Sequence, residues 1–521
     1  METNQILSRR RFVAGSAGTS LLLGLGDLPG LQSLPHVSAA EMHQVASAVR
    51  FASDVEPTLR LLEETPRDQV LEVILERTSK DLSYRELVAA LLLAGVHNIP
   101  GSSPRHHRNV GGALHGVFVV YSAHRTSLNC SAQQRWLPIL FAVDQFKRWQ
   151  TDDRGLRSDR EQNWQMSALP DTEIPAEAKA HQAFQAALDD WDEEAAERAA
   201  ASLARASGAH RVFELLSRYA VRDYRYIGHK TIFVANAWRT LQFIGWRHAE
   251  PVLRSLGRAL AAYYHQEGHP ARSDNRADRS WRHNLGLLSK LRGDWQDGTI
   301  DDAATTNLLA VVREGGDQDA SEQVVELINH GTSPRSLWDA IMCGVGEVVM
   351  RWPDFNTLHA ATTMNAMHYL YQMTQSDQTR KLILLQAAAF ATFFRSESNQ
   401  RVRFDVRVDA LDPLEPESSG AETIDEIATD LGDDRVRAAR KALAYLARGG
   451  DPRSLFERTR QWMLSKGSNA HDYKFGAAVG EDFWSMSGTW RNRQLAASLF
   501  LARSPAESDA PVYRQISEIV G

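Results

Sequence analysis

Apolar residues recur at helical spacing along most of the chain, and this pattern limits the fold more than any other feature of the sequence. Ser83 followed by Glu86 has the capping-box pattern that opens a helix, here before the apolar run 87–96. Helical spacing also covers residues 68–78, 136–149, 176–191, 193–206, 210–222, 229–264, 300–313, 318–330, 335–350, 356–374, 378–395, 434–448, 453–465 and 488–503. The sequence therefore predicts an all-α protein, a single large domain of packed antiparallel helices.

A few segments depart from this pattern. Three polar stretches, which predict surface loops, are residues 151–173, 266–280 and 397–433. Residues 402–408 alternate between apolar and charged side chains, which predicts a short strand or an extended edge. The alanine-rich segments 176–191 and 193–206 carry charges of both signs, which is typical of exposed helices.

Three histidines lie in segments that are almost free of charge. His115 and His359 occupy residues 110–123 and 355–376, which contain no acidic or basic residue, and His229 opens a third segment with a single charge. Helices that are apolar all round are buried on every side, so these imidazoles need hydrogen-bond or metal partners inside the protein. A lone buried histidine is more often a hydrogen-bonded core residue than a ligand. Three in separate apolar helices favour a common centre.

A second pattern links two of these segments. A Leu-His pair occurs at residues 114–115 and again at 358–359. In both places a second histidine follows nine residues after the first histidine, at residues 124 and 368. It raises the alternative of a domain built from two pseudo-repeated halves. The second histidine of each copy, His124 or His368, lies half a helical revolution from the first. We therefore expect both to point away from a shared centre.

The fourth candidate is His471, with Lys474 on the same helical face three residues later. Burial lowers the pKa of a lysine, and the neutral amine can add carbon dioxide to form a carbamate, a carboxylate that can bind a metal. The alternative is a solvated Lys474, or one paired with Glu481 or Asp482 one to two turns later. Taken alone, this residue favours the alternative.

The N-terminus has the pattern of a twin-arginine export signal. Ser8–Val13 (SRRRFV) precedes a glycine-diluted apolar run, residues 14–28, that is too short and too weakly hydrophobic to span a membrane. Small residues allow cleavage after Ala39. We expect residues 1–39 to be a signal peptide recognised by the twin-arginine translocase, and residues 40–521 to be a periplasmic or otherwise extracytoplasmic domain without a membrane span. The alternative is a basic, disordered N-terminus that contains three arginines.

Composition and missing motifs exclude several function classes. The net charge is −6 and no block of basic residues occurs, so a nucleic-acid partner is not expected. The two cysteines, Cys130 and Cys343, could form one disulfide but no disulfide framework. The sequence lacks Cys-x-x-Cys-His, which excludes haem of the c type. It also lacks a glycine-rich phosphate loop, a nucleophile elbow and His-Glu-x-x-His, so nucleotide-binding and common hydrolase functions have no support.

Four short motifs together resemble the questin oxidase-like family. They are GGALHGVFVVYSA at residues 111–123, GHKTIFVANA at 228–237, NTLHAATTMNAMH at 356–368 and AHDYKF at 470–475. None of them is specific alone, and together they cover a small part of the chain. The sequence departs from the family in its export signal, its acidic stretch 397–433 and the His106-His107 pair upstream of the first motif.

The resemblance implies an all-helical oxidoreductase with a mononuclear non-haem Fe(II) centre. Carried over motif by motif, its metal ligands are His115, His229, His359, His471 and a carboxylated Lys474. Such a centre inserts oxygen, as a mono- or dioxygenase, into an aromatic or quinonoid small-molecule substrate without a flavin. Imidazoles suit Fe(II), and a single carboxylate offsets part of the charge of the metal.

Other polar residues lie near these motifs. Asn236, Asn356 and Tyr473 are close enough in sequence to the proposed ligands to support them through hydrogen bonds. His248 lies in a more charged helix, which favours a surface or interface role over a ligand role.

A different class of function remains open. The chain could be an exported all-helical binding or scaffold protein without catalytic activity, in which the buried histidines only form hydrogen bonds. Metal analysis of the purified protein separates this hypothesis from a metal-dependent enzyme.

Overall fold

The structure, a computed structural model, describes residues 49, 51–102, 110–151 and 164–520. This part of the chain contains 22 α-helices and no β-strand, which confirms the predicted all-α class. The predicted signal peptide and the His106-His107 pair lie outside the described residues. The described helices pack within one unit, residues 49–521.

The helices are α3 (Glu56–Glu64), α4 (Val70–Thr78), α5 (Tyr84–Asn98), α6 (His115–Leu128), α7 (Leu137–Thr151), α9 (Ala180–Asp189), α10 (Glu193–Ala206), α11 (Ala209–Ala220), α12 (His229–Ile244), α13 (Ala249–Ala261), α14 (Arg276–Leu287), α15 (Asp302–Glu314), α16 (Asp317–Asn329), α17 (Pro334–Arg351), α18 (Phe355–Met373), α19 (Asp377–Ser398), α20 (Ala421–Asp433), α21 (Arg435–Ala447), α22 (Pro452–Lys466), α23 (Ala470–Ser485), α24 (Gly488–Ser498) and α25 (Pro511–Val520).

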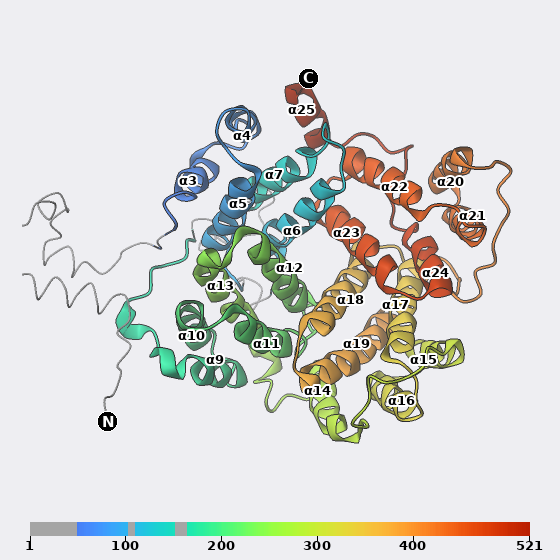
Figure 1. Ribbon diagram of the computed structural model, residues 1–521, viewed down its shortest axis with the longest axis horizontal. Coiled ribbons are helices and arrows are strands. Elements are labelled where there is room, and N and C mark those ends of the chain that lie inside the picture. The colour runs from blue at the N-terminus through green and yellow to red at the C-terminus, as the bar shows by residue number, and fades with distance from the viewer. Residues whose placement is uncertain (1–48, 50, 103–109, 152–163, 521) are drawn as a thin grey trace, which may run out of the picture. The chain divides into compact units, whose positions relative to one another are not determined.

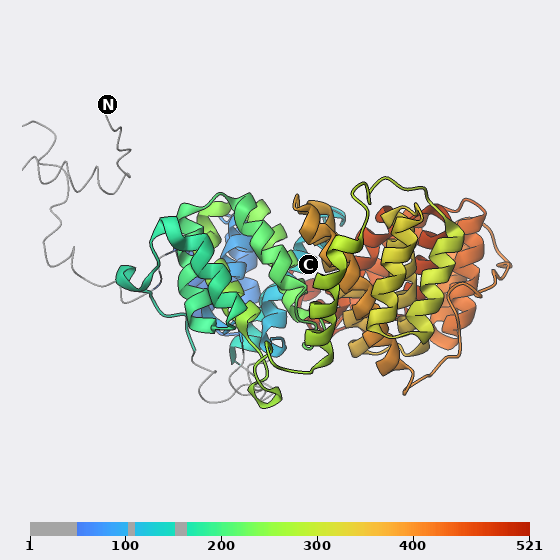
Figure 2. The ribbon, with the colours of Figure 1, turned by 90° about the horizontal axis from the view of Figure 1, so that it is seen from below.

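Four of these helices form a closed ring at the centre of the unit. α6 packs on α12, α12 on α18, α18 on α23, and α23 returns to α6 (Figure 1). The first two helices belong to the N-terminal half of the chain and the last two to the C-terminal half. Figure 2 shows the blue-to-green helices on one side of this ring and the yellow-to-red helices on the other. The ring is therefore where the two halves of the chain meet.

Capping side chains fix where several helices begin. Ser83 accepts a hydrogen bond from the backbone of Glu86 at the start of α5, as the sequence predicted. Asp354 opens α18 and Asn469 opens α23 in the same way, and both belong to capping boxes. These two caps set the starting points of helices that carry candidate ligands.

Of the two alternatives predicted for residues 402–408, a short strand or an extended edge, the strand is wrong. This segment is a loop, and the described residues contain no strand with which it could pair. Its backbone instead bonds to α17: the amide of Val408 donates to the Glu347 carboxylate (3.0 Å), and those of Arg403 and Phe404 donate to the carbonyl of Arg351. A single alternating segment forms a strand only where another strand can pair with it.

The predicted loops at 397–433 and 266–280 are shorter than expected. Helix α20 occupies the end of the first, and α14 begins within the second. Ile424, Ile427 and Leu431 form a buried face of α20. Its acidic residues Glu426 and Asp430 reach Lys441 of α21, so the negative charge that suggested a loop is neutralised by a neighbouring helix.

The alanine-rich segment 193–206 is not an exposed helix. Helix α10 buries Ala196, Ala199 and Ala200 and packs against α13. At Gly257 of α13, an added Cβ would lie 2.8 Å from the carbonyl oxygen of Ala196. The alanines therefore allow two helices to approach closely, and their small size rather than exposure explains the composition.

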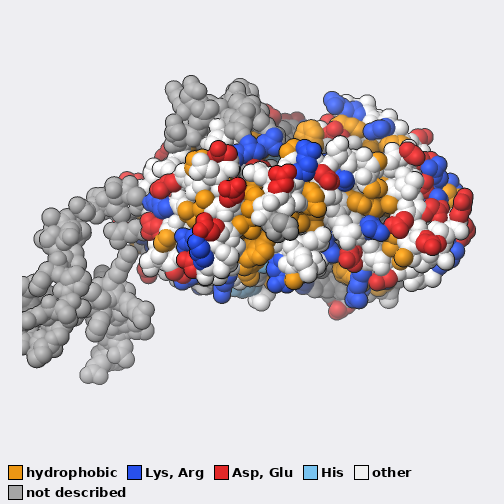
Figure 3. Space-filling model, turned by 90° about the horizontal axis from the view of Figure 1, so that it is seen from above, with side chains coloured by type: hydrophobic (Ala, Val, Ile, Leu, Met, Phe, Trp, Pro, Cys, Tyr) orange, Lys and Arg blue, Asp and Glu red, His pale blue; other side chains and the backbone are white. Residues whose placement is uncertain are grey.

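The visible surface mixes acidic and basic side chains with scattered apolar ones (Figure 3). Among the described helices, none is both long and apolar enough to cross a bilayer. Cys130 and Cys343 are both buried and do not form a disulfide with each other.

Candidate metal centre

The ring helices bring the four candidate histidines together at their N-terminal ends. His115 and His229 are the first residues of α6 and α12, His471 is the second residue of α23, and His359 is the fifth residue of α18. The N-terminal end of a helix carries a partial positive charge. The four imidazoles therefore lie in a region of positive backbone potential.

The imidazole rings form a closed set of neighbours. Ring centroids lie 5.0 Å apart for His115 and His229, 4.7 Å for His229 and His359, 4.8 Å for His359 and His471, and 4.4 Å for His471 and His115. In His115, His359 and His471, one ring nitrogen each lies within 4.8 Å of the others, a grouping that could hold a metal ion. His229 lies beside this group.

Hydrogen bonds fix how three of the rings face the centre. Nδ1 of His115 lies 2.7 Å from the carbonyl oxygen of Gly112, and Nδ1 of His359 lies 2.7 Å from that of Phe355. Nδ1 of His471 lies 3.0 Å from the side-chain oxygen of Asn469. Oxygens of this kind only accept, so each Nδ1 carries the proton and donates it. Each Nε2 is then an acceptor atom.

The Nε2 atoms of His359 and His471 face each other at 3.3 Å. With both Nδ1 atoms protonated, neither Nε2 has a proton to share, and two lone pairs meet. Nε2 of His115 is buried and has no hydrogen-bond partner among the described residues. The centre thus presents acceptor nitrogens to one another without a donor between them.

Tight backbone turns place His229. Ile227 and Gly228, the two residues before it, have φ angles of 50° and 83°. The carbonyl of Ile227 accepts a bond from Thr363 of α18, and a Cβ at Gly228 would lie 2.0 Å from that hydroxyl oxygen. At Gly111 (φ 153°), a Cβ would lie 2.6 Å from Nδ1 of His229. Gly111 therefore lets the backbone pass close to the ring of His229, and Gly228 lets it pass close to Thr363.

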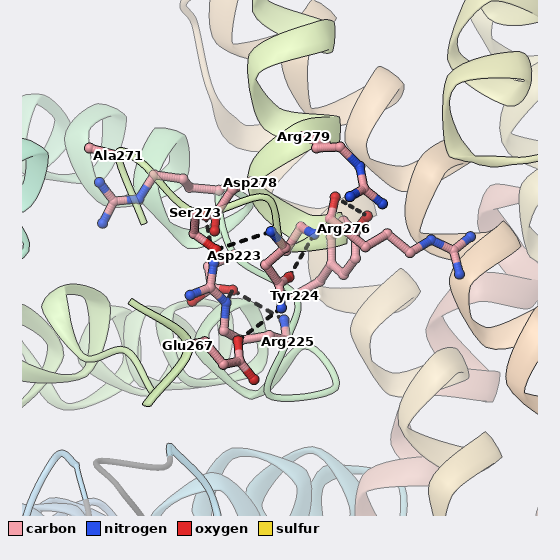
Figure 4. Close-up of polar contacts among 12 residues, drawn as sticks. Asp223, Tyr224, Arg225, Glu267, Ala271, Ser273, Arg276, Asp278 and Arg279 are labelled. Carbon is pink, nitrogen blue, oxygen red and sulfur yellow. Dashed lines mark hydrogen bonds and ion pairs between the residues drawn. The ribbon is translucent and has the colours of Figure 1, made fainter. Parts of the chain in front are cut away.

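A buried ion cluster anchors the start of α12 (Figure 4). Arg225 bridges Asp223 (2.9 Å) and Asp278 of α14 (2.5 Å), and Lys230 pairs with Asp223 at 2.8 Å. Lys230 also donates to the carbonyl of Ala262 at the end of α13. The lysine next to His229 is thus fully engaged in holding three segments together.

Lys474 is buried among the histidines, and its Nζ has no hydrogen-bond partner in the part of the chain that the structure describes. Nζ lies 5.5 Å from the centroid of the Phe118 ring. Burial lowers the pKa of this amine to about 7. The predicted pairing with Glu481 or Asp482 is wrong, because both carboxylates bond to residues of other helices.

The environment favours the neutral form of three of the imidazoles, those of His115, His229 and His359. Burial, and then the charge of Lys474, lower the pKa of His229 to about 3 and that of His115 well below its usual value. Burial and the neighbouring His229 have the same effect on the pKa of His359. No carboxylate of the described residues belongs to the converging group. The centre combines neutral nitrogens with a positive surrounding and has no anion of its own.

The predicted supporting residues bond elsewhere. Asn236 donates to the carbonyl of Phe118 (3.0 Å), Asn356 donates to Asp354 (2.9 Å), and the ring of Tyr473 stacks on Phe141. The groups that orient the histidines are instead two backbone carbonyls and Asn469. Only Asn469 could have been found in the sequence, as a helix-capping residue directly before the AHDYKF motif.

The second histidine of each Leu-His pattern packs against residues outside the centre. His124 contacts Tyr84 and Phe243, and His368 packs on Trp338, in keeping with the half-revolution offset. His248 is buried, so of the two roles predicted for it, at the surface or at an interface, the surface role is wrong. Arg247, the exposed neighbour that carries much of that charge, points to Asp54.

Asp482 is a buried carboxyl group that we expect to make the stability of the domain depend on pH. Burial and the adjacent Glu481 raise the pKa of Asp482 to about 8, and Asn365 donates to it at 2.9 Å. Between pH 4 and 8 the folded state holds a proton that the unfolded state has released. We therefore expect the free energy of unfolding to fall as the pH rises across this window, and Asp482→Asn to weaken that fall.

Urea unfolding at pH 5, 6.5 and 8 measures this effect. Asparagine reproduces the size of the protonated acid and does not titrate, so the variant should gain stability relative to the parent as the pH rises. Parallel curves for the two proteins would contradict the prediction.

No protein-family model, curated protein or solved structure matches this chain. The chemistry of the centre therefore rests on its own residues. Neutral imidazoles with inward Nε2 atoms are ligands for divalent transition metals, and bonds from Nδ1 to oxygen are typical of metal-binding histidines. The buried histidines could hold a metal ion.

Proposed function

We propose that the four histidines bind a mononuclear non-haem iron and that the protein is an exported oxidoreductase of the questin oxidase-like type. The observation that carries the proposal is the 3.3 Å approach of Nε2 of His359 to Nε2 of His471, with both Nδ1 atoms bonded to oxygen. Two lone pairs at this distance repel each other. A cation bound to both removes the repulsion, and two nitrogens that each lie about 2.0–2.1 Å from one metal are separated by about this distance without an outward shift.

Protonation of one ring would also relieve the repulsion, but burial opposes it. The pKa of His359 is held well below its usual value by burial and by its histidine and lysine neighbours. A metal ion is therefore the more favourable solution near neutral pH.

Lys474 would supply the missing anion. As a carbamate it becomes a negatively charged oxygen ligand, which the positive helix ends stabilise. It would also offset part of the metal charge, which neutral imidazoles cannot do. In this proposal His115, His229, His359, His471 and carboxylated Lys474 hold the iron.

The surrounding residues suit oxygen chemistry on an aromatic or quinonoid substrate. When bound, the iron would supply dioxygen activation. Phe118 lies against His115 and His229, with centroids 5.5 and 5.7 Å away, and keeps water from that side. On the other side Phe355 is 57% exposed, with its ring 6.2 Å from His359 and 6.1 Å from His471. It offers a planar substrate an aromatic surface close to the centre.

Metal analysis and oxygen consumption test this function. The full chain, expressed with iron and purified without chelators, should contain stoichiometric iron and consume oxygen with hydroxylated quinones as probes. A folded protein that stays free of metal after incubation with Fe(II) would overturn the proposal and leave the binding or scaffold hypothesis. Iron without oxygen consumption by any quinone would overturn the substrate class.

Export by the twin-arginine route is the second part of the proposal. Changing Arg9 and Arg10 together to lysine should leave the precursor in the cytoplasm, because the translocase recognises the arginine pair. Fractionation of cells expressing either form measures the distribution. Equal export of the double variant would contradict the assignment of residues 1–39.

A further inference from the structure

A pocket separate from the candidate centre lies between α22, α23 and α24, next to the C-terminal end of α6. Its volume of about 410 Å³ falls within the range of small-molecule sites, roughly 300–1,000 Å³. The four candidate histidines and Lys474 are not part of its lining. A ligand bound here would therefore occupy a site of its own.

The buried part of this lining is mainly apolar. It includes Leu358 of α18, Met463 of α22, Phe475 and Val479 of α23, and Leu495 of α24. Small-molecule sites are typically walled by apolar side chains that the ligand covers, with a few polar groups that fix its orientation. The apolar wall of this pocket accordingly suits the apolar body of a ligand.

Four arginines also line the pocket, and two of them are held by carboxylates of the fold. Arg503 pairs with Asp472 at 2.9 Å and with Glu507 at 2.8 Å. Arg125 lies 3.4 Å from Glu481. These two guanidinium groups are already engaged within the protein.

The other two, Arg453 and Arg460 of α22, form no ion pair with a carboxylate of the described residues. The guanidinium of Arg453 lies 5.7 Å from the ring centroid of the exposed Trp484. A guanidinium held against an aromatic face keeps the N–H groups at its edge free, where a carboxylate can accept two hydrogen bonds. Of the two acids in the described lining, Asp472 is already paired and Glu457 is exposed. The pocket thus carries an excess of positive charge that favours an anion.

We propose that this pocket binds a small aromatic carboxylate, with its charge facing Arg453 and Arg460 and its ring on the apolar wall. Phe456 and Phe475 contribute aromatic surface, which suits a planar ring. Arg453, Phe456 and Arg460 follow helical spacing, so one face of α22 presents both the cations and an aromatic side chain. The inference does not depend on a metal or on the proposed oxidoreductase function.

Gly480 provides a way to fill the pocket without disturbing its walls. It lies inside α23 and lines the pocket, and a Cβ at this position would meet no atom of the described residues within 4 Å. At Gly476, one turn earlier, a Cβ would lie 2.8 Å from Sδ of Met463, so α22 is close there and the space opens at Gly480. Gly480→Leu therefore projects a side chain into the pocket, and leucine favours a helix more than glycine does. Gly286 of α14 also faces open space and is not part of the pocket, so Gly286→Leu is the matched control.

Isothermal titration calorimetry of the full chain, freed of metal with a chelator, measures the binding. The probe is 2-naphthoate, and its uncharged amide, 2-naphthamide, is the comparison. We expect 2-naphthoate to bind in a one-to-one ratio and about tenfold or more tightly than the amide, because hydrogen bonds to a charged group are stronger than neutral ones. Gly480→Leu should abolish this binding, and Gly286→Leu should leave it unchanged.

A double variant, Arg453→Gln with Arg460→Gln, tests the recognition of charge. It should weaken the binding of 2-naphthoate by about tenfold or more and leave that of 2-naphthamide unchanged. It removes no ion pair among the described residues, so it decides the question if circular dichroism shows that Gly480→Leu does not fold.

The outcomes also separate this inference from the proposed function. Failure of the parent chain to bind 2-naphthoate, equal affinity for the acid and its amide, or binding that survives Gly480→Leu would each overturn the site. Iron content is measured independently. A protein that binds 2-naphthoate and never retains iron would keep this inference and contradict only the proposed function.

Discussion

Replacing His359 by alanine is expected to abolish iron retention. His359 lies between His229 and His471 in the ring of imidazoles, with centroids 4.7 and 4.8 Å away, and its Nε2 faces that of His471. Loss of an outer hydrogen bond to a metal ligand already costs about 10–100-fold in affinity, so loss of the ligand itself should cost more. Elemental analysis after gel filtration against a weak chelator measures the retained iron.

His368→Ala is the matched control. His368 lies on the same helix, is also buried, and packs on Trp338 instead of the centre. Both variants lose a buried imidazole and should be destabilised to a similar extent. Only His359→Ala should lose iron. Equal iron loss in the two variants would mean that general destabilisation, rather than a missing ligand, releases the metal.

The all-α class was predictable because helical spacing and capping residues act locally. The errors arose where a distant partner decides the structure. The segment 402–408 bonds to Glu347 instead of to a strand, and the acidic face of α20 pairs with Lys441. The alanines of α10 pack closely against Gly257 of α13. Each partner lies far away in sequence. Composition alone cannot show whether a charge or a small side chain meets solvent or another helix.

For the candidate centre, burial of the histidines was predictable from the sequence, but the orientation of their rings was not. Absence of charge around His115, His229 and His359 indicated buried imidazoles, which the structure describes at the ends of neighbouring helices. Which nitrogen faces inward depends on backbone carbonyls such as that of Phe355, and these carry no sequence signal. Lys474 is unpaired among the described residues because residues of other helices bond to Glu481 and Asp482, the acidic residues nearest to it in sequence. Both are tertiary properties.

Lys474 decides the charge balance of the centre. The helix ends favour an anion, yet no carboxylate of the described residues belongs to the converging group. The amine of Lys474 adds a further positive charge to the centre when it is protonated. Conversion of the amine to a carbamate reverses its charge and provides the anion without any movement of the backbone.

Lys474→Met is therefore expected to have opposite effects on the metal-free protein and on metal binding. Methionine has nearly the same length and no polar atom, so it removes a buried amine that lacks a partner. The free energy of unfolding of the metal-free protein should rise by about 1–3 kcal/mol. Iron retention should fall, because the oxygen ligand is lost. Urea unfolding of the metal-free protein and elemental analysis of the iron-loaded protein measure the two effects.

Lys230→Met is the control that separates these effects from the removal of any buried lysine. Lys230 is equally buried but pairs with Asp223 at 2.8 Å, so its loss leaves an uncompensated carboxylate. Breaking such a pair costs about 3–5 kcal/mol. The two substitutions should thus change the stability of the metal-free protein in opposite directions. If Lys474→Met is as destabilising as Lys230→Met, the amine has a stabilising partner; if it retains all its iron, four histidines hold the metal without a carbamate.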